Sequence, residues 1–107
     1  MIILRKTLAN QKSLKILFAD DEIHLQELIA AELPRMGHSV TVCPDGTTAV
    51  SALEKDTFDC VIVDLDMPGL NGIEVIRRTK ELSPTTEAIV LTGKGSTESA
   101  VDALRLG

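Results

Sequence analysis

Two pairs of acidic residues in the sequence could hold a cation. Asp20 and Asp21 are adjacent, and Asp64 and Asp66 are separated by one residue. Two ionised carboxylates about 4 Å apart repel by about 4 kcal/mol at an effective dielectric constant of 20. Several of them in one place would therefore need a compensating positive charge. Carboxylate oxygens are hard ligands that suit Mg²⁺, which keeps several of its waters. If the fold brings these acids together, the sequence predicts a magnesium site.

A hydroxyl group extends the chemistry that these acids could do. Thr92 follows the apolar run AIVL, much as Asp64 follows the apolar run VIV. A magnesium ion beside a carboxylate, with a hydroxyl nearby, is a setting for phosphoryl transfer onto that carboxylate. Taken alone, an aspartate after a strand is usually a turn or cap residue, and a lone threonine packs in a strand. Only the combination of these residues favours a chemical site.

Four apolar runs of strand length alternate with four segments of helical pattern. The expected strands are 14–19, 39–43, 58–63 and 87–92, and the expected helices are 22–36, 47–55, 72–82 and 96–106. Strict alternation of this kind predicts a parallel sheet with helices on both faces. Ligands of such sheets bind beyond the carboxyl ends of the strands. The acids and Thr92 follow the first, third and fourth strands, so they converge if those strands are neighbours.

The helix expected over residues 22–36 has a recognisable apolar pattern and recognisable ends. Asp21 is the expected N-cap, Gly37 the expected stop, and Pro34 should kink the last turn because it lacks an N–H. The residues expected to form the buried stripe are Ile23, Leu25, Leu28, Ile29, Leu33 and Met36.

The overall composition limits the kind of protein. A chain of 107 residues, 44% of them hydrophobic, is enough for one domain with one core. We expect residues 1–13 to be an N-terminal tail and residues 14–107 to be the domain. No apolar run approaches the ~18 residues of a membrane span, and the opening MIIL is too short for a signal peptide. The expected location is therefore the cytoplasm, without membrane contact.

The charge and the side-chain inventory also exclude some functions. The net charge is −5, no run of Lys or Arg is present, and the only aromatic residues are Phe18 and Phe58. Direct nucleic acid binding by this domain is therefore not expected. Cys43 and Cys60 lie in apolar runs without the spacing of a disulfide framework or a zinc site, so we interpret both as core residues.

Three segments closely resemble the receiver domain of two-component response regulators. They are FADDE (18–22), VIVDLDMPGLNG (61–72) and LTGKGS (91–96), and the resemblance extends in order and spacing over residues 14–107. It implies a flavodoxin-like (CheY-like) fold, a doubly wound parallel sheet with strand order 2-1-3-4 over the strands present.

The resemblance also implies a role for each residue of the motifs. Asp64 corresponds to the phosphoacceptor, which takes a phosphoryl group from a histidine kinase or a phosphotransfer protein. Asp20 and Asp21 correspond to the acidic pair that binds Mg²⁺, with Asp21 the more direct ligand. Asp66 stands where the family offers a backbone carbonyl to the metal, and Thr92 where it has its switch hydroxyl. The implied function is phosphorelay signalling that controls an output domain or partner, transcription included, without enzymatic turnover beyond self-catalysed phosphotransfer and dephosphorylation.

The sequence departs from the family pattern at its C-terminal end. The family has a fifth strand, which bears a lysine that contacts the phosphoryl group, and a fifth helix, whereas this chain ends at Gly107 before both. The fourth strand is then expected to be an open edge. We expect this edge to be covered either by a second copy of the chain in a homodimer or by the N-terminal tail.

Two other functions stay open at this point. Haloacid-dehalogenase-type phosphatases also form an aspartyl phosphate at a DxDx[TV] motif, which would make Asp64 the nucleophile of an enzyme. Here Pro68 follows the motif, which lies on the third expected strand and not near the start of the chain. The other function is a pseudo-receiver that serves only as a docking module.

Overall fold

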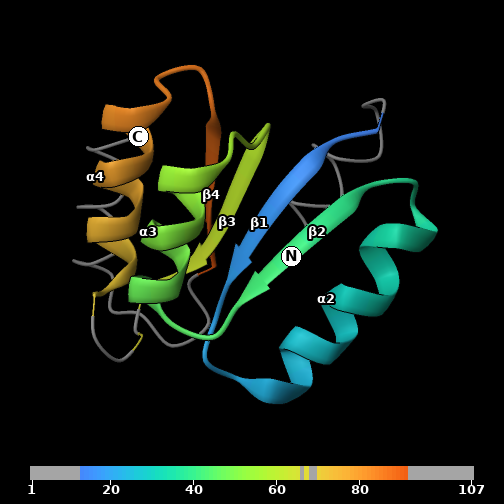
Figure 1. Ribbon diagram of the computed structural model, residues 1–107. Coiled ribbons are helices and arrows are strands. Elements are labelled where there is room, and N and C mark those ends of the chain that lie inside the picture. The colour runs from blue at the N-terminus through green and yellow to red at the C-terminus, as the bar shows by residue number, and fades with distance from the viewer. Residues whose placement is uncertain (1–12, 66, 68–69, 92–107) are drawn as a thin grey trace.

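A four-stranded parallel sheet forms the centre of the computed structural model, which describes residues 13–65, 67 and 70–91 (Figure 1). Its order is β2-β1-β3-β4. The elements in chain order are β1 (Lys15–Ala19), α2 (Ile23–Arg35), β2 (Ser39–Cys43), α3 (Gly46–Lys55), β3 (Cys60–Asp64), α4 (Gly72–Leu82) and β4 (Glu87–Leu91). This confirms the predicted strand order 2-1-3-4. The helix expected over 96–106 and residues 1–12 of the expected tail lie outside the described residues.

The sheet is covered on both faces, which makes it doubly wound. In β1, Leu17 packs on the side of α3 and α4, whereas Ile16 and Phe18 pack on the side of α2. Successive side chains of a strand point to opposite faces, so a run of apolar residues supplies both cores. Every residue of β3 is buried, as expected for a strand with a helix layer on each side. Figure 1 shows α2 on one side of the sheet and α3 with α4 on the other.

The buried stripe of α2 is narrower than the pattern predicts. Ile29 and Leu33, four residues apart, are buried, but Ile23 is 60% exposed and Leu28 is 46% exposed. At about 100° per residue, Leu28 lies about 100° from Ile29 around the helix and therefore points away from the sheet. Met36 is the C-cap, beyond the last helical residue, and is also exposed. The prediction that these three residues face the core is wrong.

The N-cap of α2 is Glu22. The prediction that Asp21 is the N-cap is wrong. The Glu22 carboxylate accepts hydrogen bonds from the backbone N–H groups of His24 and Leu25, at 3.2 and 2.9 Å. The Glu22 N–H in turn donates to Oδ1 of Asp20 at 2.8 Å. The longer glutamate side chain can fold back onto the first turn, which leaves Asp21 exposed. The cap therefore lies one residue nearer the helix.

The end of α2 is as predicted at Gly37. Pro34 lies inside the last turn and the helix continues to Arg35. Gly37 has a φ of 92°, in the left-handed region that favours glycine, and its N–H donates to the carbonyl of Pro34. Helix α2 thus ends where the chain must turn toward β2.

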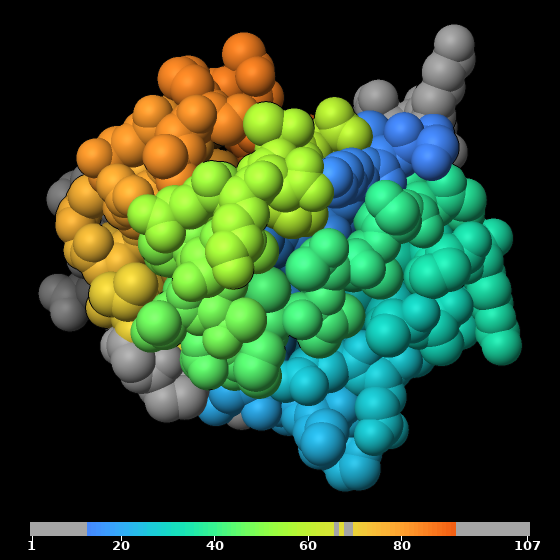
Figure 2. Space-filling model, viewed as in Figure 1, coloured from blue at the N-terminus to red at the C-terminus, as the bar shows by residue number. Residues whose placement is uncertain are grey.

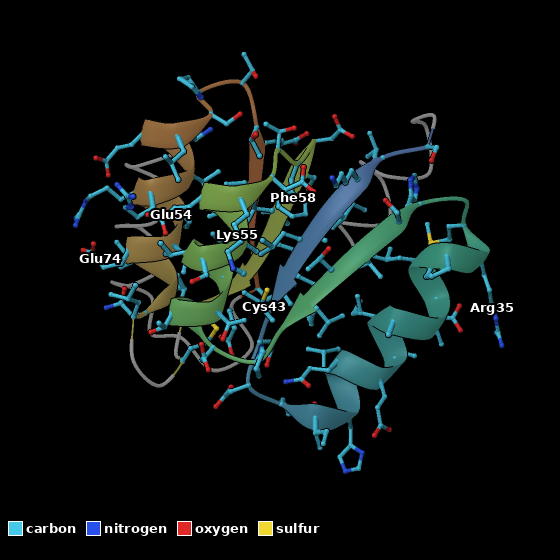
Figure 3. The ribbon with its side chains drawn as sticks, in the orientation of Figure 1. Arg35, Cys43, Glu54, Lys55, Phe58 and Glu74 are labelled. Carbon is cyan, nitrogen blue, oxygen red and sulfur yellow. The ribbon has the colours of Figure 1, made fainter. Side chains whose placement is uncertain are left out.

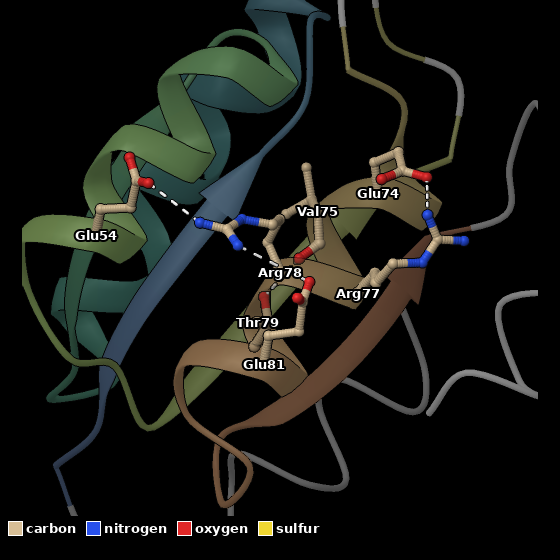
Figure 4. A network of polar contacts seen from close by, with 7 residues as sticks. All are labelled: Glu54, Glu74, Val75, Arg77, Arg78, Thr79 and Glu81. Atoms are coloured by element: carbon tan, nitrogen blue, oxygen red, sulfur yellow. Dashed lines mark hydrogen bonds and ion pairs between the residues drawn. The ribbon is translucent and has the colours of Figure 1, made fainter.

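Helices α3 and α4 lie side by side over one face of the sheet, in green and orange in Figure 2. An ion pair between Arg78 of α4 and Glu54 of α3, at 3.1 Å, joins them across their exposed sides (Figure 4). Within α4, the buried Thr79 hydroxyl donates to the carbonyl of Val75. An exposed ion pair contributes little on its own. The pairing of the two helices therefore depends chiefly on the apolar side chains beneath them.

Candidate functional site

The two acidic segments emerge next to each other because β1 and β3 are neighbours. The strands are parallel with Ala19 opposite Val63, so Asp20 and Asp64 follow at the same edge of the sheet. Asp64 is the last residue of β3 and Asp20 the first residue after β1. Both are buried, at 4% and 3% exposure, whereas Asp21 is exposed. The site therefore has two buried acids and one exposed acid.

The carboxylates of Asp20, Asp21 and Asp64 meet in one place. One oxygen from each lies within 4.8 Å of the others. Two ionised carboxylates at that distance repel by about 3.5 kcal/mol at an effective dielectric constant of 20. A divalent cation would remove this repulsion, and three carboxylate oxygens are a donor set that fits a hard ion such as Mg²⁺. The site can therefore hold the metal that the sequence predicts.

The acidic turn after β1 is held by hydrogen bonds from three directions. The N–H of Asp20 donates to the carbonyl of Cys43 at the end of β2 (3.1 Å), and Figure 3 labels Cys43 near the arrowheads of β1 and β2. The Asp20 carboxylate accepts from the N–H of Glu22, and its carbonyl accepts from the side chain of Gln26 at 2.7 Å. Asp20 is thus fixed to the neighbouring strand and to the start of α2.

The loop that follows Asp64 is packed against the first residues of two helices. The N–H of Gly72, the first residue of α4, donates to the carbonyl of Leu65 at 3.0 Å. A Cβ on Gly72 would lie 2.2 Å from the backbone oxygen of Asp64, and a Cβ on Gly46 would lie 1.9 Å from the backbone oxygen of Leu70. Only glycine permits such close backbone approach. The starts of α3 and α4 therefore fix the path of the chain beyond β3.

Asp45 and Asn71 hold these two helix starts in place. Asp45 precedes Gly46 and accepts a hydrogen bond from the N–H of Thr48 at 2.7 Å. Asn71 precedes Gly72 and accepts from the N–H of Glu74 at 3.1 Å. Each cap satisfies one of the free N–H groups of a helix start.

The two cysteines lie at strand ends: Cys43 is the last residue of β2 and Cys60 the first residue of β3. Cys43 and Cys60 are buried and not in a disulfide, as the sequence predicts. Burial raises the pKa of Cys43 to about 11, with a smaller contribution from the charge of Asp45, and burial raises the pKa of Cys60 to about 12. Thiols that stay protonated are poor nucleophiles and poor metal ligands. The end of β2 is therefore chemically quiet, as its sequence indicates.

The structure brings together three of the five predicted site residues. Asp20, Asp21 and Asp64 form the cluster, whereas Asp66 and Thr92 lie outside the described residues. The sequence pattern did not point to Gln26 or Gly46. A glutamine on a helix carries no signal of its own, and the close approach of Gly46 to Leu70 depends on the fold.

A family model for the response regulator receiver domain matches residues 16–107 of the chain. The chain therefore belongs to the family of receiver domains of two-component response regulators, and a receiver domain takes part in phosphorelay signalling. The match agrees with the strand order and with the position of the acidic cluster. Its start at residue 16 lies close to the domain start at residue 14 that we expected, although the exact boundary stays a prediction.

Similar proteins are transcriptional regulators. The chain is 34% identical over 92 residues to the uncharacterized transcriptional regulatory protein YkoG of Bacillus subtilis, a match that covers 86% of this chain and 40% of that protein. It is 34% identical over 88 residues to the transcriptional regulatory protein FixJ of Bradyrhizobium diazoefficiens, with 82% and 43% covered. The chain thus spans about two fifths of the length of these relatives.

Solved structures agree on the fold. The receiver domain of the Francisella response regulator 1452 superposes with a TM-score of 0.78 at 28% identity, over 89% of this chain and 78% of that one. NtrX from Brucella abortus gives a TM-score of 0.80 at 29% identity, over 89% of this chain and 22% of that one. Within the part of the chain that is described, no helix is long and apolar enough to cross a membrane.

Proposed function

We propose that this domain accepts a phosphoryl group on Asp64 from a histidine kinase or a phosphotransfer protein, in a reaction that depends on Mg²⁺. The observation that carries the proposal is the meeting of Asp20, Asp21 and Asp64 within 4.8 Å at the carboxyl edge of the sheet. Asp64 is the acceptor in this proposal because it ends the buried strand β3, which lies between β1 and β4, and because it pairs with Leu91 of β4.

The proposed reaction is attack by a carboxylate oxygen of Asp64 on the phosphorus of a phosphohistidine. An O–P bond forms, the N–P bond breaks, and the imidazole nitrogen leaves with the electron pair and takes up a proton. Asp20, Asp21 and Asp64 would hold the Mg²⁺, together with the backbone carbonyl of Asp66. The ion would offset the negative charge of the carboxylates and of the incoming phosphoryl oxygens. The chain itself orients Asp64 and supplies the acidic ligands.

The proposed consequence of phosphorylation is a change of conformation. The phosphoryl group carries about −1.5 to −2 charges and three strong acceptor oxygens, as on other phosphorylated side chains, in place of the single negative charge of the carboxylate. In the proposal the hydroxyl of Thr92 donates to one of these oxygens. Such a contact favours one of two conformations of the domain over the other, and this shift controls an attached output domain or a partner. Because the similar proteins are transcriptional regulators, the output we propose is control of transcription.

The test is phosphorylation of the full chain by phosphoramidate, a small phosphoryl donor, followed by intact-mass measurement. We expect one phosphoryl group per chain with Mg²⁺ and none with EDTA. The Asp64→Asn variant should take up none. The control is Asp59→Asn, immediately before the first residue of the same strand, where an asparagine oxygen can still accept the hydrogen bond from the N–H of Lys15. That control should be labelled like the wild type.

Three outcomes would contradict the proposal. Labelling that persists in Asp64→Asn would place the acceptor elsewhere. Multiple turnover of a small phosphate ester, with loss of turnover in Asp64→Asn, would indicate a phosphatase of the haloacid-dehalogenase type. Absence of both labelling and Mg²⁺ binding would favour a docking module.

A further inference from the structure

Gln26, on the second turn of α2, reaches back to the acidic turn formed by residues 20–22. Its side-chain Nε2 donates to the backbone oxygen of Asp20 at 2.7 Å, and its own N–H donates to the carbonyl of Glu22 at 3.0 Å. The first of these bonds is not part of the helical pattern, because it joins residues six apart through a side chain. The side chain is half-buried, so this contact is partly shielded from competing water.

The carbonyl that Gln26 holds belongs to the peptide unit that joins the two neighbouring acids. The C=O of Asp20 and the N–H of Asp21 lie in one planar group, so fixing the oxygen also fixes the direction in which Asp21 leaves the turn. The rest of Asp20 is already held, since its N–H donates to Cys43 and its carboxylate accepts from Glu22. The bond from Gln26 therefore completes the ordering of this turn.

We propose that Gln26 is a positioning residue that holds the carboxylates of Asp20 and Asp21 in the arrangement that binds Mg²⁺ beside Asp64. The inference rests on the proposed function, because it deepens the account of the same metal site. The group that Gln26 Nε2 holds is the backbone oxygen of Asp20, whereas the carboxylates of the cluster would bind the ion. It acts by ordering the turn before the ion arrives, so that less conformational freedom is lost on binding.

The expected loss of Mg²⁺ affinity can be taken from other residues that hydrogen-bond to metal ligands. Loss of a hydrogen-bond partner behind a metal ligand weakens metal binding by roughly 10- to 100-fold. Gln26 holds a backbone oxygen of a ligand residue and not the ligand atom itself. We therefore expect the lower end of that range, a roughly tenfold weaker binding of Mg²⁺ when the bond is lost.

The test compares Gln26→Met with Ala30→Met in the full chain. Methionine has nearly the length of glutamine and a similar helix propensity but no N–H donor. Ala30 is exposed one turn further along α2, so its replacement controls for an added methionine on the helix. Titration with Mg²⁺ should show roughly tenfold weaker binding for Gln26→Met and unchanged binding for Ala30→Met.

A second measurement separates positioning from general stability. In metal-free protein, hydrogen exchange at the Glu22 amide, which donates to Asp20, should be faster in Gln26→Met, while the Ile29 amide in the middle of α2 keeps its protection. Equal Mg²⁺ affinity in wild type and Gln26→Met, or an unchanged Glu22 amide, would overturn the inference and leave the proposed function standing. A wild type that binds no Mg²⁺ would instead overturn the proposed function and the inference with it.

Discussion

Gly72 lets α4 begin directly against the end of β3, and its replacement by alanine should impair Asp64 itself. A Cβ at this position would lie 2.2 Å from the backbone oxygen of Asp64 and 2.7 Å from the Cα of Leu65. Both neighbours are backbone atoms, so neither can move aside as the end of a side chain could. The strain of the substitution must therefore displace the backbone of Asp64, the proposed acceptor.

The magnitude can be worked from this geometry. Ordinary van der Waals contact begins at 3.4 Å, which exceeds 2.2 Å by 1.2 Å, so the backbone of Asp64 and the start of α4 must separate by about that distance. Overpacking of a well-packed site costs about 1–3 kcal/mol of stability. A misplacement of about 1 Å at a reacting group can slow a reaction about 100-fold. We therefore expect Gly72→Ala to lose both stability and about two orders of magnitude in phosphorylation rate.

The assay measures the initial rate of Asp64 phosphorylation by phosphoramidate at saturating Mg²⁺, together with urea denaturation. The matched control is Gly37→Ala. Gly37 has a φ of 92° but no atom within 4 Å of a Cβ, so alanine there costs about 1–2 kcal/mol of backbone strain far from the acids. The control should therefore lose stability and keep the wild-type phosphorylation rate.

The reasoning would be refuted by Gly72→Ala that stays folded and is phosphorylated at the wild-type rate. It would also fail if Gly37→Ala lost as much of the rate as Gly72→Ala, because the effect would then follow stability alone.

Three further predictions concern charge, acid stability and thiol reactivity. Asp20→Asn removes one of the two buried carboxylates of the site, so in EDTA the free energy of unfolding measured in urea should rise by up to about 3.5 kcal/mol. Mg²⁺ should then add little further stability to this variant. A lower free energy of unfolding in EDTA would contradict this. The pKa of Asp45 is lowered, chiefly by the hydrogen bond from the backbone N–H of Thr48. Ionised Asp45 therefore adds to the folding stability above its ordinary pKa of 3.8, and this stability is lost as the pH falls through the lower folded-state pKa. Asp45→Ala should therefore flatten the acid limb of a stability–pH curve, and an unchanged limb would refute the assignment. Cys43 and Cys60 should resist iodoacetamide in the native protein near neutral pH and react together in urea, as mass spectrometry can check, because burial raises both pKa values to about 11 and 12.

The elements of the fold could be predicted because their signals are local. The run VIVD needs no distant residue to favour a strand, and α4 begins at Gly72 and ends at Leu82 as its pattern indicates. The acids were also found from the sequence, because aspartates directly after two strands of a parallel sheet stand at the edge where ligands bind. Alternation left open which strands are neighbours, and the order 2-1-3-4 came from the resemblance to receiver domains.

The details of α2 could not be read from its pattern. Periodicity placed Leu28 in the same stripe as Ile29, but the width of the buried face depends on how much of the sheet the helix covers. The choice of Glu22 over Asp21 as the cap likewise depends on the turn made with Asp20. Both errors concern contacts that a local pattern does not contain.

The sequence by itself determined the type and order of the elements and the presence of an acid at each of two strand ends. The tertiary structure decided that the oxygens of Asp20, Asp21 and Asp64 lie within 4.8 Å of one another, and that Gln26 reaches the Asp20 carbonyl. It also decided that Gly72 lies against the backbone of Asp64. The physical reason is that strand propensity and apolar periodicity act over a few neighbouring residues. The site, in contrast, is made by chain segments more than forty positions apart, which meet only when the sheet forms.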